Sequence, residues 1–246
     1  MFGYGVDKRV LYILFGVLIA YSLYSMSSSD WLSLLLTLPA VIVAITFHEY
    51  AHANAADKLG DTTPRNQGRL TLNPISHLDL FGFILLVFAH IGWGKPVQIN
   101  PNNFVNSNKS RGFCETMVAL AGPLMNFFIA LISCFAYVII TSIRPGFVFS
   151  NMGQLLMIFL QTLIVINIGL GVFNLIPLPP LDGEKIFKRL LPYRVQEWLN
   201  RNYYTIYVVF MFLWIFGLLE VIVAPIIEVL MNGLFWIVTI IVGLIL

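Results

Sequence analysis

Charged residues are scarce in this sequence. They make up 11% of its 246 residues, against the roughly 25% that is usual for soluble domains, whereas 59% of the residues are apolar. No long polar stretch separates the apolar runs, so an appended soluble domain is not expected. The composition excludes an ordinary soluble globular protein and predicts a single integral membrane domain over residues 1–246.

Cysteine and clustered positive charge are scarce too. The two cysteines, Cys114 and Cys134, lie in or beside one apolar run, where thiols usually act as small apolar side chains. The net charge is only +2, and no basic run is interleaved with aromatic residues as a nucleic-acid-binding groove requires. We therefore expect no nucleic acid partner.

Long apolar runs, by contrast, are abundant. A membrane-spanning helix needs about 20 apolar residues. Six segments meet that length: residues 10–27, 31–56, 114–142, 151–177, 204–223 and 225–246. The first lacks a clear small-residue cleavage site, which favours a retained span over a signal peptide. The predicted fold is an all-α integral membrane protein with about six transmembrane helices, the last two forming a C-terminal helical hairpin (204–246) bent at Ala224-Pro225.

A further apolar run is too short to cross a membrane. Residues 80–93 reach about two-thirds of the required length, and the stretch GKPVQINPNNF that follows is too rich in Pro, Gly and Asn to be helical. We predict that residues 80–101 form a short re-entrant, β-like segment associated with the membrane. All three clusters of Lys and Arg then lie on one side, which the positive-inside rule identifies as the cytoplasm. The N-terminus should therefore face the cytoplasmic side of the cell membrane.

The stretch TFHEYAHAN, residues 46–54, places ionisable groups at the end of an otherwise uncharged run. On a helix, His48 and His52 lie about one turn apart on the same face, which is the spacing that a tetrahedral metal ion needs. In HExxH metalloproteases the glutamate after the first histidine, here Glu49, is the general base. Each ionisable group at membrane depth costs about 2.5–3.5 kcal/mol on insertion scales, so a mere helix end is a poor explanation for three of them.

A catalytic zinc ion usually takes three protein ligands, so a third is required. The open candidates are His77, His90, Asp79, Glu115, Asp182, Glu184, Glu220 and Glu228. Topology favours Asp182, because the second and fourth predicted spans run in the same direction and bring it to the side and depth of the histidines. Glu184 is the alternative, since another class of zinc proteases uses glutamate. For His77 a turn-stabilising hydrogen bond is the better interpretation, and for His90 a structural or interfacial role.

Two separated motifs resemble the site-2 protease family, peptidase family M50. HEYAH (48–52) and NLIPLPPLDG (174–183) match the family signature, which pairs HExxH with N-x-x-P-x-x-x-L-D-G. The likeness extends to GRLTLNPISHLD (68–79), GWGKPVQINP (92–101) and AGPLMN (121–126), and so covers about residues 40–190. Members are intramembrane zinc metalloproteases, and the chain is similar to a compact form without a PDZ or CBS domain.

The resemblance implies a catalytic core over about residues 31–190 and one Zn²⁺ per chain. His48, His52 and Asp182 would bind the metal, Glu49 would activate water, and Asn174 would contact substrate or stabilise the oxyanion. The implied activity is hydrolysis of peptide bonds in or near transmembrane segments of membrane-anchored proteins, as in regulated intramembrane proteolysis. The active-site opening would lie on the cytoplasmic side.

The family is also described as holding its substrate in extended form. We predict that Gly94, Lys95, Pro96 and Val97 bind an unwound substrate as an added strand. Asn126 in AGPLMN has either a packing role or a substrate-binding role at the site. The expected partners are a transmembrane protein substrate, the lipid bilayer and a regulatory membrane partner.

Two other functions compete with proteolysis. The polar cluster would also suit a membrane metal transporter, but transport does not require a glutamate beside a ligand histidine. A catalytically inactive relative that binds membrane proteins is disfavoured, because every catalytic position of the family is filled.

Overall fold

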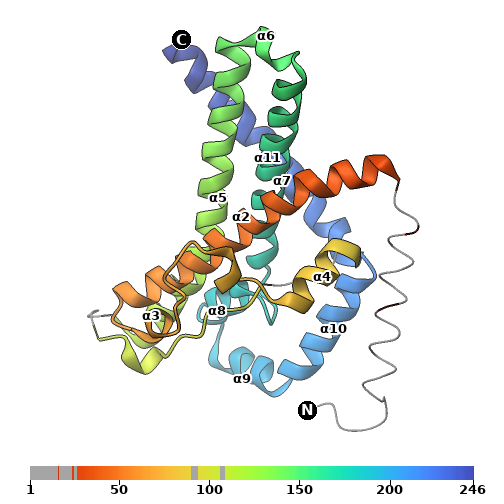
Figure 1. The fold of residues 1–246 in the computed structure, drawn as a ribbon. Helices are drawn as coiled ribbons and strands as arrows, with labels where there is room; N and C mark the ends of the chain where they lie inside the picture. The colour runs from red at the N-terminus through yellow and green to blue at the C-terminus, as the bar shows by residue number, and fades with distance from the viewer. Residues whose placement is uncertain (1–15, 17–23, 25–26, 90–93, 106–108) are drawn as a thin grey trace.

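The computed structural model of the protein describes residues 16, 24, 27–89, 94–105 and 109–246 (Figure 1). Four helices dominate this part of the chain: α2 (Ser28–Lys58), α5 (Arg111–Ile143), α7 (Asn151–Asn174) and α11 (Leu218–Ile245). Each contains a stretch long and apolar enough to cross a membrane. The predicted all-α, multi-pass membrane protein is therefore confirmed. The described residues contain no strand, only an isolated antiparallel bridge between Leu78 and Gly94.

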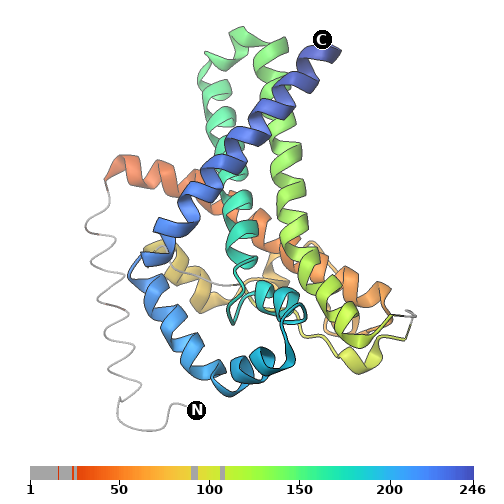
Figure 2. The same cartoon turned by 180° about the vertical axis from the view of Figure 1, so that it is seen from behind.

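Helices α5, α7 and α11 pack together, and α2 crosses α5 and α7 at a steep angle (Figures 1 and 2). Their shared core consists of small or branched side chains: Ala130, Cys134, Val138, Ile164, Ile168, Val172, Val223, Val238 and Val242. Small residues let helix backbones approach closely, which matters in lipid, where no hydrophobic force drives helices together. The outer faces carry exposed apolar side chains such as Phe128, Ile132 and Val165, as a lipid-facing surface requires.

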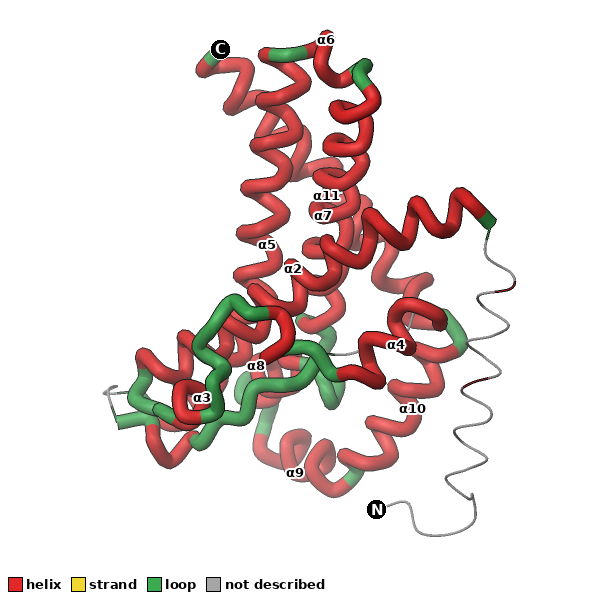
Figure 3. The backbone as a smooth tube through the Cα atoms, in the orientation of Figure 1, coloured by secondary structure: helices red, strands yellow, loops and turns green. Residues whose placement is uncertain are grey.

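Short helices cap both ends of this bundle. Helix α6 (Pro145–Val148) joins α5 to α7 at one end, whereas α3 (Thr63–Asn66), α8 (Asp182–Lys188) and α9 (Tyr193–Arg201) gather at the other (Figure 3). The 3₁₀ turns η1 (Pro74–Ser76) and η2 (Pro101–Asn103) belong to the loop between α2 and α5. The motif-bearing loops therefore meet at the end of the bundle opposite to α6.

The C-terminal region differs from the predicted hairpin. Helix α10 (Tyr203–Ile215) ends well before Pro225, which lies inside α11. The break is instead at Gly217, whose φ of 69° lies in the left-handed region that favours glycine. Membrane helices tolerate an internal proline because neighbouring groups satisfy the freed backbone carbonyl. The bend predicted at Ala224-Pro225 is therefore wrong.

Only some of the predicted spans correspond to helices long enough to cross a membrane. Those at 31–56, 114–142 and 151–177 correspond to the long helices α2, α5 and α7. Helix α10 has only 13 residues, which extend over roughly 20 Å and fall short of a hydrocarbon core of about 30 Å. The first predicted span, 10–27, lies almost entirely outside the described residues.

The loop over residues 80–101 combines helix and extended chain. It begins with α4 (Leu80–Ala89), and residues 94–100 are not helical; we call them the extended segment, because Gly94 forms a β-bridge and Asn100 has extended φ and ψ of −117° and 101°. Leu78 forms the bridge to Gly94, and the Lys95 N–H donates to the carbonyl of His77 at 2.7 Å. At Gly94 the chain thus lies next to Leu78 again, and it does so close to α2.

Candidate metal centre

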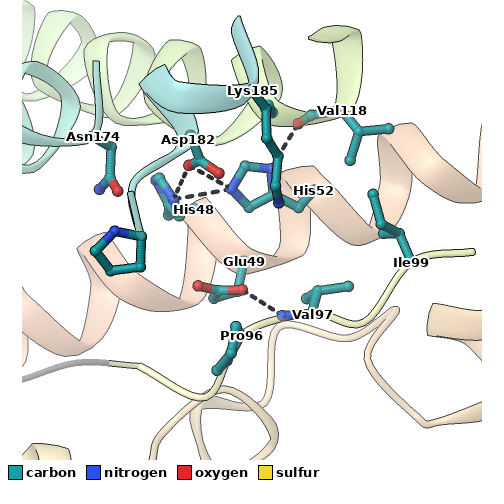
Figure 4. Close-up of a pocket in the computed structure, with 12 residues that line it drawn as sticks. His48, Glu49, His52, Pro96, Val97, Ile99, Val118, Asn174, Asp182 and Lys185 are labelled. Carbon is teal, nitrogen blue, oxygen red and sulfur yellow. Dashed lines mark hydrogen bonds and ion pairs between the residues drawn. The ribbon is translucent and has the colours of Figure 1, made fainter. Parts of the chain in front are cut away.

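Three side chains from two distant parts of the chain meet at the motif-bearing end of the bundle (Figure 4). Helix α2 presents His48 and His52 on one face, and α8 begins at Asp182. The Nε2 atoms of the two histidines are 3.0 Å apart, and Asp182 Oδ2 lies 3.2 Å from His48 Nε2 and 3.0 Å from His52 Nε2. Both histidines are buried. The predicted pair of histidines and the favoured aspartate therefore form one compact cluster.

The donor atoms fit a divalent metal ion. In a tetrahedral zinc site with ligand bonds of about 2.0–2.2 Å, neighbouring ligand atoms lie roughly 3.3–3.6 Å apart, close to the distances found here. The other ring nitrogens are already bonded: His48 Nδ1 to Asn126 Oδ1 and His52 Nδ1 to the carbonyl of Val118, both at 2.6 Å. A carbonyl only accepts, so Nδ1 of His52 donates and Nε2 of a neutral ring keeps its lone pair for a metal.

A buried amide network holds His48 in place. Asn126 on α5 is fully buried, and its Nδ2 donates to the carbonyl of Ala44 and to Oδ1 of Asn167 on α7. Asn167 in turn donates to the carbonyl of Leu163. Asn126 therefore orients His48; substrate binding by Asn126 stays a prediction. Sequence reasoning missed Asn167, which is one of several amides in α7.

Gly122 brings α5 against the two imidazoles. A Cβ atom at this position would contact His52 Nε2 and lie 2.6 Å from His48 Cε1. The absence of a side chain is therefore what leaves room for the ligand rings and for an ion between them.

The NLIPLPPLDG stretch places Asp182 beside His48 and His52. Helix α7 ends at Asn174, and the prolines that follow lack the backbone N–H needed to continue a helix. Gly183 lies tightly over this turn, because a Cβ there would sit 2.5 Å from the carbonyl oxygen of Leu175. Burial alone would raise the pKa of Asp182, but the adjacent His52 and His48 outweigh it and hold the pKa below its usual range.

Glu49 faces the extended segment rather than the ligand cluster. Its Oε2 accepts a hydrogen bond from the N–H of Val97 at 3.0 Å. Gly94 permits this approach, since a Cβ there would lie 2.8 Å from Cγ2 of Ile45 on α2. The predicted base and the predicted substrate-binding stretch are therefore direct neighbours.

Two buried charges anchor the extended segment at its ends. Arg69 donates to the carbonyls of Ser76, Lys95 and Pro96. Asp61 is fully buried and accepts from the N–H of Asn100 at 2.6 Å.

Hydrogen bonds also keep Asp61 ionised. Burial would raise its pKa, but bonds from Thr63, Asn100 and Asn103 lower the pKa below the ordinary aspartate value. Sequence reasoning missed both anchors. Arg69 nevertheless lies in the quoted GRLTLNPISHLD stretch.

The other candidate ligands lie elsewhere. Glu184, the alternative third ligand, accepts from Lys188 at 2.8 Å and is not part of the cluster of His48, His52 and Asp182. His77 Nε2 bonds to the carbonyl of Thr71 at 2.7 Å, which confirms the turn-stabilising role. Asp79 accepts from the N–H of Gly82 at the start of α4. Glu115, Glu220 and Glu228 are not part of the cluster, and His90 lies outside the described residues.

Two cavities open beside Glu49. The first, which we call the polar cavity, has a volume of about 150 Å³ and includes the three ligands, Val97, Ile99 and Lys185 in its wall. The second, the aromatic cavity, has a volume of about 540 Å³ and includes Phe173, Phe210 and Trp214. Asn174, whose Nδ2 donates to the carbonyl of Leu170, lines both.

A metal-binding cluster and an adjacent glutamate on a membrane helix define a membrane metallopeptidase of the HExxH type. Comparisons agree: a family model described as Peptidase family M50 matches residues 147–218. The candidate zinc metalloprotease YwhC of Bacillus subtilis is 39% identical over 178 residues, which cover 71% of this chain and 78% of YwhC. The chain therefore belongs to peptidase family M50, the site-2 protease family that its motifs resemble.

Two more distant relatives are also named as candidate zinc metalloproteases. The candidate zinc metalloprotease Rip2 of Mycobacterium tuberculosis is 30% identical over 146 residues, 58% of this chain and 52% of Rip2. The candidate zinc metalloprotease MJ0611 of Methanocaldococcus jannaschii is 26% identical over 182 residues, 74% of this chain and 84% of MJ0611. No solved structure matches the chain.

The contact at Gly122 predicts a strong effect of a single methyl group. Gly122→Ala should push the imidazoles apart and lower metal affinity about 10- to 100-fold, the loss typical when ligand support is removed. Metal content of the purified protein under chelator competition measures this. Gly112→Ala on the same helix is the control, because its Cβ would have its nearest neighbour, Arg189 Nη1, at 3.6 Å. Equal metal content in both variants would contradict the assignment.

The amide network predicts a second, subtler loss. Asn126→Leu keeps the side-chain volume but leaves His48 Nδ1 without its partner, so metal affinity should fall about 10-fold or more while the helical content stays unchanged. Chelator titration together with circular dichroism separates the two quantities. Unchanged affinity in a folded variant would show that the network does not support the ligand.

Proposed function

We propose that this protein is an intramembrane zinc metalloendopeptidase, which hydrolyses peptide bonds in or near the transmembrane segments of membrane-anchored proteins. One observation carries the proposal: His48, His52 and Asp182 converge at the end of a membrane helix whose Glu49 borders an extended segment. Family membership and the zinc metalloproteases among the relatives support it.

The chain's own residues suggest how the reaction proceeds. When bound, zinc supplies Lewis-acid activation of water and of the scissile carbonyl. Glu49 lines both cavities, so its carboxylate is positioned to take a proton from attacking water and to deliver it to the leaving amine. The Val97 N–H holds that carboxylate toward the extended segment. Asn174 lines both cavities as well and is suited to stabilise charge on the carbonyl oxygen.

The substrate backbone must be unwound to reach these groups, and the extended segment offers a template. Arg69 and Asp61 occupy backbone groups at its two ends. The N–H groups of Gln98 and Ile99 have no partner in the described part of the chain. Along an extended chain the backbone groups alternate between edges, so the Ile99 N–H shares the edge of the Val97 N–H that meets Glu49. Substrate would add as a strand there.

The membrane arrangement is part of the same proposal. The pairing of Leu78 with Gly94 supports a re-entrant loop over residues 80–101 that enters and leaves on one side. A first span at 10–27 would add a fifth crossing to those of α2, α5, α7 and α11, one fewer than the predicted six, with the N-terminus and the active-site opening on the cytoplasmic side of the cell membrane. A transmembrane protein would be the substrate, and a regulatory membrane partner would control access.

The decisive test uses Glu49. Detergent-purified protein should cleave a single-span test substrate only when zinc is present, and Glu49→Gln should keep its zinc but lose activity by about 10²- to 10⁴-fold, the usual contribution of a general base. Cleavage is followed by gel analysis and zinc by elemental analysis. Equal cleavage by the two proteins would refute the proposed function.

The strand-addition step has its own test. Ile99→Pro removes one unpartnered N–H without breaking an internal hydrogen bond, so cleavage should slow about 10-fold while zinc content stays unchanged. Ile99→Ala, which keeps the N–H, is the matched control. If the proline and alanine variants cleave at the same rate, the segment does not pair with substrate at this residue.

A further inference from the structure

The polar and aromatic cavities meet at the proposed catalytic group. Both are lined by His48, Glu49, Pro96, Asn174 and Pro180. Beyond this shared wall their chemistry differs, because the polar cavity adds His52, Asp182 and Lys185 beside small and branched apolar residues, whereas the aromatic cavity adds aromatic and aliphatic side chains and no charged group. A peptide bond held at Glu49 therefore has a polar compartment on one side and an apolar compartment on the other.

The extended segment runs from one cavity to the other. Gly94 and Pro96 line the aromatic cavity, whereas Val97 and Ile99 line the polar cavity. A substrate strand paired with this segment would pass both compartments in order. Residues on the two sides of the reacting bond would thus meet different surroundings.

The aromatic cavity suits a bulky apolar side chain. Phe173, Phe210 and Trp214 form a ring cluster with centroids 5.6–6.2 Å apart. Met211 on α10 also lines the cavity and adds an adaptable apolar surface. The volume of about 540 Å³ lies within the range of established ligand pockets, roughly 300–1,000 Å³.

Lys185 gives the polar cavity an unmatched positive charge. It lies one turn after Asp182 on α8 and has no ion-pair or hydrogen-bond partner within the described residues. Its neighbours on the same helix differ: Lys188 pairs with Glu184, and Arg189 donates to Ser110. The two carboxylates in the cavity wall, Glu49 and Asp182, would be offset by a divalent ion. The Lys185 ammonium would then be left to attract an anion.

We propose that the protein selects cleavage sites of mixed character. A large apolar or aromatic residue stands on one side of the scissile bond and occupies the aromatic cavity, while an aspartate or glutamate on the other side binds Lys185. This specificity rests on the proposed proteolytic function and narrows its substrate class. Lys185 acts as a specificity-determining residue and takes no part in proton transfer.

The charge arm of the test uses nine substrates and three enzymes. Single-span test substrates carry Phe on one side of the cleaved bond and Glu, Gln or Lys at each of three positions on the other. Wild type should prefer Glu at one position by about 2- to 5-fold in KM, as expected for a solvent-accessible charge pair. Lys185→Glu should reverse the order in favour of Lys. Lys188→Gln, on the same helix but paired outside the cavity, should match wild type.

The apolar arm fills the other cavity. Met211→Trp should lower kcat/KM for a substrate with Phe at the apolar position by about 10-fold and leave a substrate with Ala there nearly unaffected. Val209→Trp is the control, because Val209 is exposed on the same helix. Loss on both substrates alike would overturn the assignment of this cavity.

A binding measurement separates recognition from turnover. Fluorescence anisotropy of the same substrates with Glu49→Gln, alone and combined with Lys185→Glu, should reproduce the charge preference without cleavage. If wild type cleaves, Glu49→Gln does not, and Lys185→Glu ranks the Glu, Gln and Lys substrates in the same order as wild type, the selectivity is wrong while the proposed function stands. If Glu49→Gln cleaves as wild type does, the proposed function itself fails.

Discussion

The site depends on two hydrogen bonds that hold the imidazoles of His48 and His52 from behind. Each Nδ1 lies 2.6 Å from an oxygen on α5, one from Asn126 and one from the Val118 backbone. These bonds place the opposite ring nitrogens toward Asp182, and they satisfy polar atoms that would otherwise be costly in an apolar bundle. The close approach at Gly122 follows from the same requirement, since α5 must touch α2 for the bonds to form.

The site has a helical part and a loop part with different means of support. The ligand histidines are held by α2, α5 and α7 through buried side chains. The parts of the site that come from loops are held differently: the buried charges Arg69 and Asp61 hold the extended segment, and the glycine-dependent turn at Gly183 holds the third ligand, Asp182. The ligand histidines are therefore supported by packing and by hydrogen bonds to α5, whereas the loop parts of the site are supported by buried charges and a tight turn.

Much of the site could be predicted from sequence, because the spacing of residues along the chain indicates both the metal ligands and the membrane helices. The i, i+4 histidines and the long apolar runs led to α2 and its ligands, and the shared direction of two spans led to Asp182. The position of the C-terminal break could not be predicted this way, since a proline is tolerated inside a membrane helix and Gly217 was one of many glycines. Val118 acts through its carbonyl, which every residue has, and the role proposed for Lys185 rests on the lack of a partner among the described residues, which the sequence does not reveal.

The bridge between Leu78 and Gly94 has a consequence for how this protein can vary. Because the chain leaves and re-enters at paired residues, the loop between them is closed at its base. Its length can then change at a small cost in closure entropy, about 0.6 kcal/mol for each doubling, without shifting the segment that meets Glu49. In the proposed re-entrant arrangement, the depth to which the loop reaches into the bilayer would thereby be separable from the position of the segment beside Glu49.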